Sequence, residues 1–375
     1  MNFLNKLVHH DLASDNLPAI KYLNLSIVNG DPFGSASSVS LRFLEHRSTP
    51  FLDSPQDYYA SIIRFKIDTL SLPVMQAQAQ IGQSDVNKLN YSFTMSYDGQ
   101  TFQQFIEYAP ADLSASLPQP PLTTQDLSTG YYNMYSYQHF IDLCNVALQD
   151  CFTGLNALVT LPTTLAPWIT FDTTSKDITF NVDAAAFADS VSDPIELFMN
   201  ASCHSLFSSF QCTYFGDVGI EDGKNFQFVL KNRNQTNVYE LDIGSVTYNI
   251  LQAYQEDDCV ALWNPVQSIV ICSSTLPIEG TMIASPKIFN SAMTSYNSSQ
   301  NVSTPILSDF QASEMLFRSY VEYSPYYPRL IEMYSRTSQS SISIECYWMD
   351  VYNNMNPLML PPNCSANIKI AFYKK

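Results

Sequence analysis

The size and the charge of the chain exclude several classes of protein. With 375 residues, 46% of them hydrophobic, the chain is long enough to bury a large core, which excludes a fibrous or disordered protein. The formal net charge of -17, with only 18 Lys and Arg dispersed along the sequence, argues against direct binding of nucleic acid or of an anionic membrane surface.

The first residues, 1–20, predict an N-terminal arm rather than a signal peptide. His9, His10 and Asp11 interrupt the apolar residues, so the segment has no apolar h-region. No stretch of the sequence is long and apolar enough for a membrane span. We therefore expect synthesis in a reducing compartment, where the eight cysteines, which form no CxxC pair, are reduced and buried as small apolar side chains.

Short apolar or alternating stretches predict strands along most of the chain. The expected strands are 21–28, 38–43, 58–67, 90–97, 168–171, 178–182, 195–199, 226–230, 238–243 and 268–272. Strands of this length, separated by turn-rich segments, favour a mainly β protein built as a sandwich over one built on a parallel sheet.

Residues 109–130 interrupt this pattern with four prolines and predict a linker or long loop. The expected domain division is therefore an arm at 1–20, a first β region at 21–108, this linker, and a second β region at 131–375.

One long amphipathic helix is predicted at 137–158, where apolar side chains recur every three or four residues. Ser136 is expected to cap its start, and Leu161 and Pro162 to close it. We expect the helix to cover one end of the β-sandwich; the alternative is a helix that binds a partner.

The C-terminal residues give the clearest strand pattern. Apolar residues alternate with polar ones from 342 to 349 and again from 366 to 373. Because turn residues separate the two runs, they are expected to form neighbouring antiparallel strands.

No catalytic, cofactor-binding or metal-binding residue is predicted. The sequence has no phosphate-binding loop and none of the common hydrolase motifs. Cys203 and His204 are adjacent, but in a β-like run their side chains point to opposite faces, which prevents a nucleophile and base pair.

Two acidic clusters and three tryptophans are candidates for binding residues. The clusters, 256–258 and Asp217 with Glu221 and Asp222, lack the regular spacing of a calcium loop and are expected to be solvated turns. Trp168, Trp263 and Trp348 could stack on sugars, but Trp348 is expected in the core.

Several aromatic and turn-rich stretches distributed over most of the chain are similar to those of one group of viral proteins. They are DYYASIIRF (57–65), YYNMYSYQHFIDLCN (131–145), LFSSF (206–210), GKNFQFVL (223–230), LWNPVQSIV (262–270), PKIFNS (286–291) and YWMDVYNNMNPLMLPPNCSANIKIAFYKK (347–375). The chain resembles minor capsid or penton-type proteins of small icosahedral DNA viruses of the virophage and polinton-like kind. Asn354 stands where the resemblance implies a turn glycine, and Asn tolerates left-handed geometry.

The resemblance implies a jelly-roll β-sandwich with a second β region, and a structural role in the virion. The expected protein is a penton or minor capsid subunit, not an enzyme, that forms a homopentamer at an icosahedral vertex and contacts the major capsid protein. Two alternatives remain open from the sequence: a receptor- or glycan-binding surface protein of the virion, and a β-sandwich hydrolase.

Overall fold

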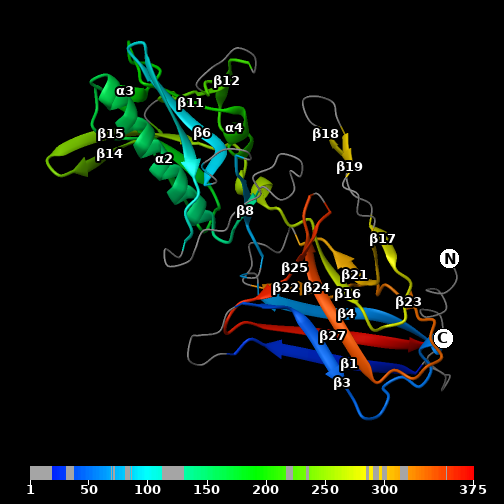
Figure 1. Ribbon diagram of the computed structural model, residues 1–375. Coiled ribbons are helices and arrows are strands. Elements are labelled where there is room, and N and C mark those ends of the chain that lie inside the picture. Colours follow the sequence, from blue (N-terminus) through cyan, green and yellow to red (C-terminus); the bar gives the residue numbers. More distant parts are fainter. Residues whose placement is uncertain are drawn as a thin grey trace. The chain divides into compact units, whose positions relative to one another are not determined.

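The computed structural model describes residues 19–30, 38–68, 70, 72–80, 85, 87–111, 131–216, 223–233, 236–283, 287–289, 295–297, 302–312, 320–351 and 353–375. The chain folds into two compact units (Figure 1). One unit is built from two chain segments, Met1–Leu72 and Val266–Lys375, and is called the two-segment unit. The other is the continuous segment Pro73–Pro265, called the inserted unit.

Two antiparallel sheets form the two-segment unit. The first, in the order β1-β27-β4-β22 with β23 also on β4, contains β1 Ile20–Val28, β27 Ser365–Lys374, β4 Tyr58–Asp68, β22 Tyr320–Tyr323 and β23 Ile331–Glu332. The second, in the order β21-β16-β24-β25 with β3 also on β24, contains β21 Ile306–Phe310, β16 Ser268–Ser273, β24 Ser341–Met349, β25 Met355–Pro357 and β3 Arg42–His46.

Shorter elements complete this unit. They are the 3-10 helix η1 Pro55–Asp57 and the pairs β2 Val39–Ser40 with β26 Met359–Leu360, β17 Thr281–Ile283 with β20 Val302–Thr304, and β18 Lys287–Phe289 with β19 Ser295–Asn297.

The strand pairing of the two-segment unit is that of a jelly roll. In sequence order its eight principal strands are β1, β3, β4, β16, β21, β22, β24 and β27. The first pairs with the eighth, the second with the seventh, the third with the sixth and the fourth with the fifth. An antiparallel ribbon folded over on itself produces this nesting and divides the strands between two sheets. The jelly-roll sandwich expected from the sequence is therefore confirmed.

The core of the two-segment unit lies between these sheets. From β24 it receives Ile342, Ile344, Cys346 and Trp348, each exposed by 4% or less, and from β27 alternate residues that include Phe372. The alternation predicted for both C-terminal strands is confirmed, because every second side chain of a strand points to the same face.

The expectation that these two strands are neighbours is wrong. β24 pairs with β16, β3 and β25, whereas β27 pairs with β1 and β4 in the other sheet. The chain between them forms β25 and β26, and this extra length carries it from one sheet to the other. A simple hairpin would have needed only a few turn residues.

The turn after β24 differs in one detail from the expectation. The residue in the left-handed region is Asn353, with φ of 59°, rather than Asn354. Asn354 instead closes the turn, because its backbone and side-chain nitrogens both donate hydrogen bonds to the Asp350 carboxylate, at 2.9 and 3.0 Å.

Two sheets and three helices form most of the described part of the inserted unit. One sheet, in the order β14-β15-β10-β9, contains β14 Val238–Ile243, β15 Val246–Tyr254, β10 Ile178–Asp183 and β9 Trp168–Phe171. The other, in the order β12-β13-β11-β6-β7, contains β12 Cys212–Tyr214, β13 Phe226–Phe228, β11 Glu196–Met199, β6 Lys88–Tyr97 and β7 Gln100–Glu107. The remaining elements are the pair β5 Met75–Gln78 with β8 Tyr131–Met134, the α-helices α2 Tyr137–Leu158, α3 Ala184–Phe187 and α4 Ala201–Leu206, and the 3-10 helix η4 Val260–Trp263.

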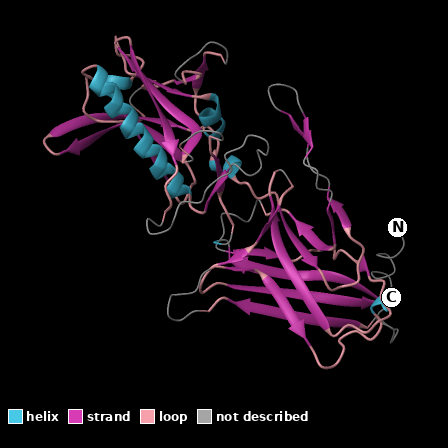
Figure 2. Ribbon diagram, viewed as in Figure 1, coloured by secondary structure: helices cyan, strands magenta, loops and turns pink. Residues whose placement is uncertain are grey.

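The predicted helix is confirmed at its predicted bounds, as α2 Tyr137–Leu158 (Figure 2). Its apolar face packs on β6, β7 and β9, so it covers strands of the inserted unit. The contact with β7 is close: a Cβ added to Gly154 would lie 2.3 Å from the Phe102 ring. Ser136 stands at the N-cap position, but its side chain makes no capping hydrogen bond.

The predicted strands agree with the observed ones to within two residues, apart from 38–43. That stretch is divided into β2 and β3 at Leu41. The Leu41 amide donates a hydrogen bond to the Leu358 carbonyl, and its carbonyl accepts one from the Cys346 amide.

The observed division of the chain differs from the expected one. β6 and β7 pair with each other and β6 pairs with β11, so strands within the expected first region 21–108 belong to the inserted unit. Strand pairing between distant segments determines the division, and a composition change does not reveal such pairing. Residues 1–18 of the expected arm and 112–130 of the expected linker lie outside the described residues.

Candidate functional site

The structure places Cys203 and His204 on helix α4 and not in a strand. Cys203 is fully buried, and this burial raises the pKa of its thiol well above the ordinary value. The His204 ring stacks on Phe226 with the ring centroids 3.7 Å apart, and burial lowers the pKa of the imidazole. None of the described histidines hydrogen-bonds to a Ser, Thr or Cys side chain.

Two hydrogen bonds hold the acidic turn 256–258, one from a residue just after it and one from a distant serine. The Asp258 carboxylate accepts a hydrogen bond from the Val260 amide at 2.9 Å, and the Ser209 hydroxyl donates to the Asp257 carbonyl at 2.6 Å. Within the described ranges, no three His, Cys, Asp or Glu residues meet as metal ligands would. The second cluster, Asp217, Glu221 and Asp222, lies outside the described residues.

Two of the three tryptophans belong to the cores. Trp348 is 4% exposed in the two-segment unit, as expected, and Trp263 is 4% exposed in the inserted unit. The Trp263 indole donates a hydrogen bond to the Leu206 carbonyl at 2.7 Å. Trp168 is half-buried on β9. Rings held in a core cannot stack on a sugar at the surface.

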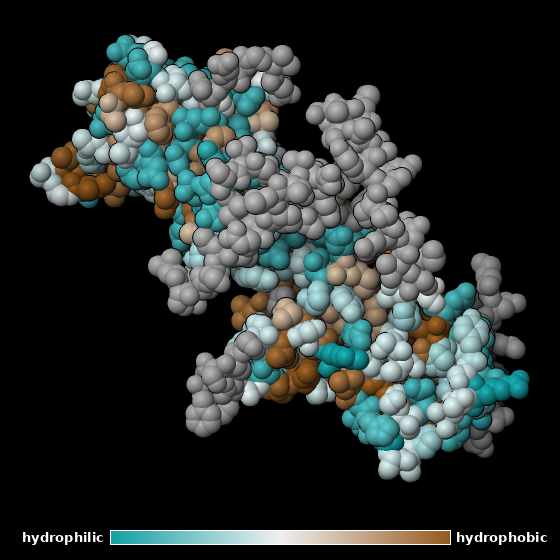
Figure 3. Space-filling model, viewed as in Figure 1, coloured by the Kyte–Doolittle hydropathy of each residue, from teal (hydrophilic) through white to brown (hydrophobic). Residues whose placement is uncertain are grey.

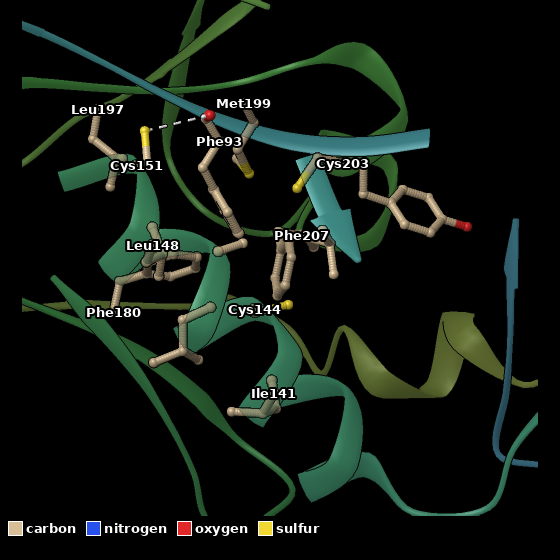
Figure 4. Close-up of a cluster of buried hydrophobic side chains, with 14 of the residues drawn as sticks. Phe93, Ile141, Cys144, Leu148, Cys151, Phe180, Leu197, Met199, Cys203 and Phe207 are labelled. Atoms are coloured by element: carbon tan, nitrogen blue, oxygen red, sulfur yellow. Dashed lines mark hydrogen bonds between the residues drawn. The ribbon is translucent and has the colours of Figure 1, made fainter. Parts of the chain in front are cut away.

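The cysteines are unpaired thiols, and seven of the eight are buried. Figure 4 shows Cys144, Cys151 and Cys203 among apolar side chains of the inserted unit, with the Cys151 thiol donating to the Phe93 carbonyl. Burial raises the pKa of Cys151 to about 12. These thiols are packing residues, because a reactive cysteine needs an accessible thiolate.

The negative charge of the chain is concentrated in one unit. The inserted unit holds 21 Asp and Glu against 5 Lys and Arg, which leaves -16, whereas the two-segment unit holds 14 against 13, which leaves -1. Although the cations are dispersed along the sequence, most of them therefore belong to the jelly roll.

Three of these cations lie together on the outer face of the β1-β27-β4-β22 sheet. Phe65 and Ile368 point into the core, so their neighbours Arg64 and Lys66 on β4 and Lys369 on β27 point outward. We call these three residues the cationic face. Arg64 and Lys369 are directly opposite each other in the strand register. Among the described residues, the ion pairs are made by other cations, Arg42, Arg47, Arg329 and Lys375.

Tyrosines surround the cationic face and orient its amines. The Lys369 amine lies 4.6 Å from the centre of the Tyr22 ring on β1, and the Lys66 amine lies 4.2 Å from that of Tyr320 on β22. Such contacts attract a cation to the ring face and restrict a flexible side chain. The result is a surface of ordered charges and aromatic rings.

Acidic residues also lie on this sheet: Asp68 on β4, two positions after Lys66, and Glu322 and Glu332 on the strands that flank β4. Glu322 on β22 is opposite Lys66 in the register, and Glu332 on β23 hydrogen-bonds to Lys375. Two positions along β27 and β4 from Lys369 and Arg64, the uncharged Asn367 is opposite the cation Lys66. The sheet face is therefore positive around Arg64 and Lys369.

The sequence alone does not predict this surface. Alternation places Lys369 on the polar side of its strand, but Arg64 and Lys66 are about 300 positions away, and only the pairing of β4 with β27 brings them together.

The inserted unit has a different exposed feature, the hairpin formed by β14 and β15. Its turn contains Gly244 at φ of 64°, and the flanking Ile243 and Val246 are 46% and 48% exposed. Apolar atoms gather at the free end of this hairpin in Figure 3. Two apolar side chains form a small patch, and scattered exposed apolar residues are common on monomers.

None of the described helices is long and apolar enough to cross a membrane.

The chain is similar in sequence to two proteins of Sputnik virophage. The chain is 30% identical to the uncharacterized protein V18 of Sputnik virophage over 123 residues, which are 31% of this chain and 74% of that protein. It is 22% identical to the structural protein V19 of Sputnik virophage over 207 residues, which are 55% of this chain and 93% of that protein.

Two solved structures share the fold over nearly the whole chain. A chain in the 3.5 Å cryo-EM structure of the Sputnik virophage aligns with a TM-score of 0.78 at 24% identity, covering 96% of this chain and 99% of that one. The crystal structure of the mavirus penton protein aligns with a TM-score of 0.59 at 14% identity, covering 95% and 100%. The family model of the Sputnik minor capsid protein V18/19 matches residues 21–374, and the chain belongs to that family.

Proposed function

We propose that this protein is a structural, non-enzymatic subunit of an icosahedral virus capsid and occupies its vertices as a penton. The observation that carries the proposal is the match of a minor capsid protein family over residues 21–374. The jelly roll, shared in fold with the mavirus penton protein, supports it. In this role the protein assembles as a homopentamer, contacts the major capsid protein and becomes part of the virion.

The physical requirements of such a ring fit the exposed surface of the chain. A ring closes when one surface of each copy binds a different surface of the next, so a subunit needs two unlike surfaces. The neutral jelly roll and the strongly acidic inserted unit provide such a difference. Exposed tyrosines, such as Tyr22 and Tyr320, are residues that interfaces favour.

The cysteines fit a protein made in a reducing compartment. A disulfide needs two thiols with their Cα atoms within about 7 Å, and all eight thiols here are unpaired. We propose that they stay reduced in the virion, which mass mapping of non-reduced particles would check.

Native mass spectrometry of the purified protein, together with quantitative mass spectrometry of virions, tests this function. We expect complexes of five 42.2 kDa chains and a low copy number in virions relative to the major capsid protein. A chain that is strictly monomeric in solution and missing from purified virions would contradict the proposal.

A further inference from the structure

We infer that the cationic face of the β1-β27-β4-β22 sheet is a contact between neighbouring copies of this chain, where Arg64, Lys66 and Lys369 oppose carboxylates of the neighbour. This inference rests on the proposed function, because it assumes that copies assemble, and it identifies the surface through which they do so.

The first argument is the arrangement of the charges. Arg64 and Lys369 are directly opposite on adjacent strands, a position in which like charges repel and destabilise a sheet. Neither they nor Lys66 take part in an ion pair among the described residues. An anionic partner would relieve this repulsion.

The second argument is the order of the side chains. The Tyr22 and Tyr320 rings hold the amines of Lys369 and Lys66 at 4.6 and 4.2 Å, so these amines lose less freedom when a partner binds. Tyr373 and Tyr59, opposite each other on β27 and β4, extend the aromatic surface toward the end of β27. Tyrosine and arginine are the residue types that dominate contact energies in interfaces.

The third argument identifies the occupant by charge. Each copy carries a net charge of -17, and nearly all of it lies in the inserted unit. Acidic surfaces of neighbouring copies repel each other, so copies in one ring need cations between them. In a chain with 18 Lys and Arg against 35 Asp and Glu, the described surface on which Arg64 and Lys369 face each other, with Lys66 beside them, is a positive complement to those acidic residues.

Charge reversal with a matched control tests the inference. Arg64→Glu with Lys369→Glu changes the net charge by four, and so does the control Arg47→Glu with Arg336→Glu, which alters exposed cations of the same unit outside this face. Native mass spectrometry and sedimentation should show association weakened at least about tenfold by the first pair and changed less than about twofold by the control. Thermal melting of both variants should remain close to that of the unaltered protein, because the altered side chains are at the surface.

Zero-length carboxyl-to-amine crosslinking identifies the occupant. A mixture of isotope-labelled and unlabelled chains should give crosslinks from Lys66 or Lys369 of one copy to Asp or Glu of the other. Crosslinks confined to one copy, or exclusively to another virion protein in intact particles, would overturn the inference. A double-stranded DNA probe provides a further test. If the unaltered chain bound the probe, and the charge-reversal variant lost this binding but still assembled, the inference would also be overturned.

The two proposals fail in different ways. If the unaltered chain forms rings and the reversal variant assembles like its control, the contact is wrong and the vertex role stands. If the unaltered chain assembles neither in solution nor in particles, the proposed function fails and the contact fails with it.

Discussion

In the two-segment unit the central strands come from both ends of the chain, since β27 lies between β1 and β4 and Leu23 is paired with Ile370. In the inserted unit, β6 and β7 are joined by a turn at Asp98 and Gly99. The jelly roll buries its core only after both segments have met, whereas the inserted unit can begin from local contacts. A jelly roll can therefore tolerate a long insertion when the inserted segment folds on its own.

The two units also differ in charge. The inserted unit carries -16 and the jelly roll -1, and the cationic face belongs to the jelly roll. If the cationic face is the proposed contact, charge reversal there should weaken association without unfolding either unit, and packing variants in the inserted unit should lower its stability without changing that face.

Deleting 365–375 should have the largest effect. The deletion removes β27, whose Ile368, Ile370 and Phe372 are each exposed by 1% or less and contribute about 1.5–3 kcal/mol apiece. That loss is comparable with a typical domain stability of about 5–15 kcal/mol, so the two-segment unit should unfold. Hydrogen exchange should show full exchange in its strands and retained protection in β6, β10 and α2.

The matched variant is the inserted unit alone, 73–265, which we expect to fold and melt cooperatively. If hydrogen exchange showed the deletion unfolding both units together, the comparison between an autonomous and a dependent unit would be wrong.

Trp348→Ala should be the most damaging single substitution in the jelly roll. The indole is 4% exposed between the two sheets, and removing a buried aromatic side chain costs about 3–5 kcal/mol. The control is Leu44→Ala, at 65% exposure on the adjacent strand β3, which should change stability by less than about 0.5 kcal/mol. Denaturant unfolding monitored separately for each unit gives the measurement, and equal losses in the two variants would contradict the assigned core.

Gly154→Ala tests how closely α2 approaches its sheet. In a free helix this change stabilises by about 1 kcal/mol. Here the new Cβ would lie 2.3 Å from the Phe102 ring, so we expect a net loss of about 1–3 kcal/mol in the inserted unit. As a control, the double variant Gly154→Ala with Phe102→Ala should remove most of the clash. Denaturant unfolding measures the stabilities. If Gly154→Ala alone were stabilised, α2 would pack less closely on β7 than the structure shows.

Two helix starts in the inserted unit provide a matched pair, and its Ser136 member has the smallest expected effect. Ser136→Ala should cost less than about 0.5 kcal/mol, because its side chain makes no capping bond. Asn200→Ala should cost about 2 kcal/mol, because the Asn200 side chain accepts from the Cys203 and Ser92 amides and donates to the Asn90 carbonyl. Thermal melting of the two variants measures both losses of stability. Equal losses would contradict the difference in hydrogen bonding between the Ser136 and Asn200 side chains.

Local patterns in the sequence predict elements well and their pairing poorly. The helix 137–158 and the strand 342–349 follow from apolar periodicity, which depends on which side chains face the core. The pairing of β24 with β16 and of β27 with β1 depends on contacts between segments far apart in the chain, and periodicity carries no information about a partner strand.

The same limit applies to the candidate site. Alternation places Lys369 on a polar strand face, but its register with Arg64 follows from the bulge and pairing of β4. Likewise, Cys203 and His204 are helical because the Asn200 side chain caps α4, a local signal that the β-like interpretation of that stretch overlooks.

Cryo-EM of virus particles that contain this chain would decide between the vertex role and its alternatives. We predict five copies around each icosahedral five-fold axis, with the β1-β27-β4-β22 sheet of each copy against its neighbour. Vertices occupied by another protein, with this chain found elsewhere or absent, would contradict the vertex role.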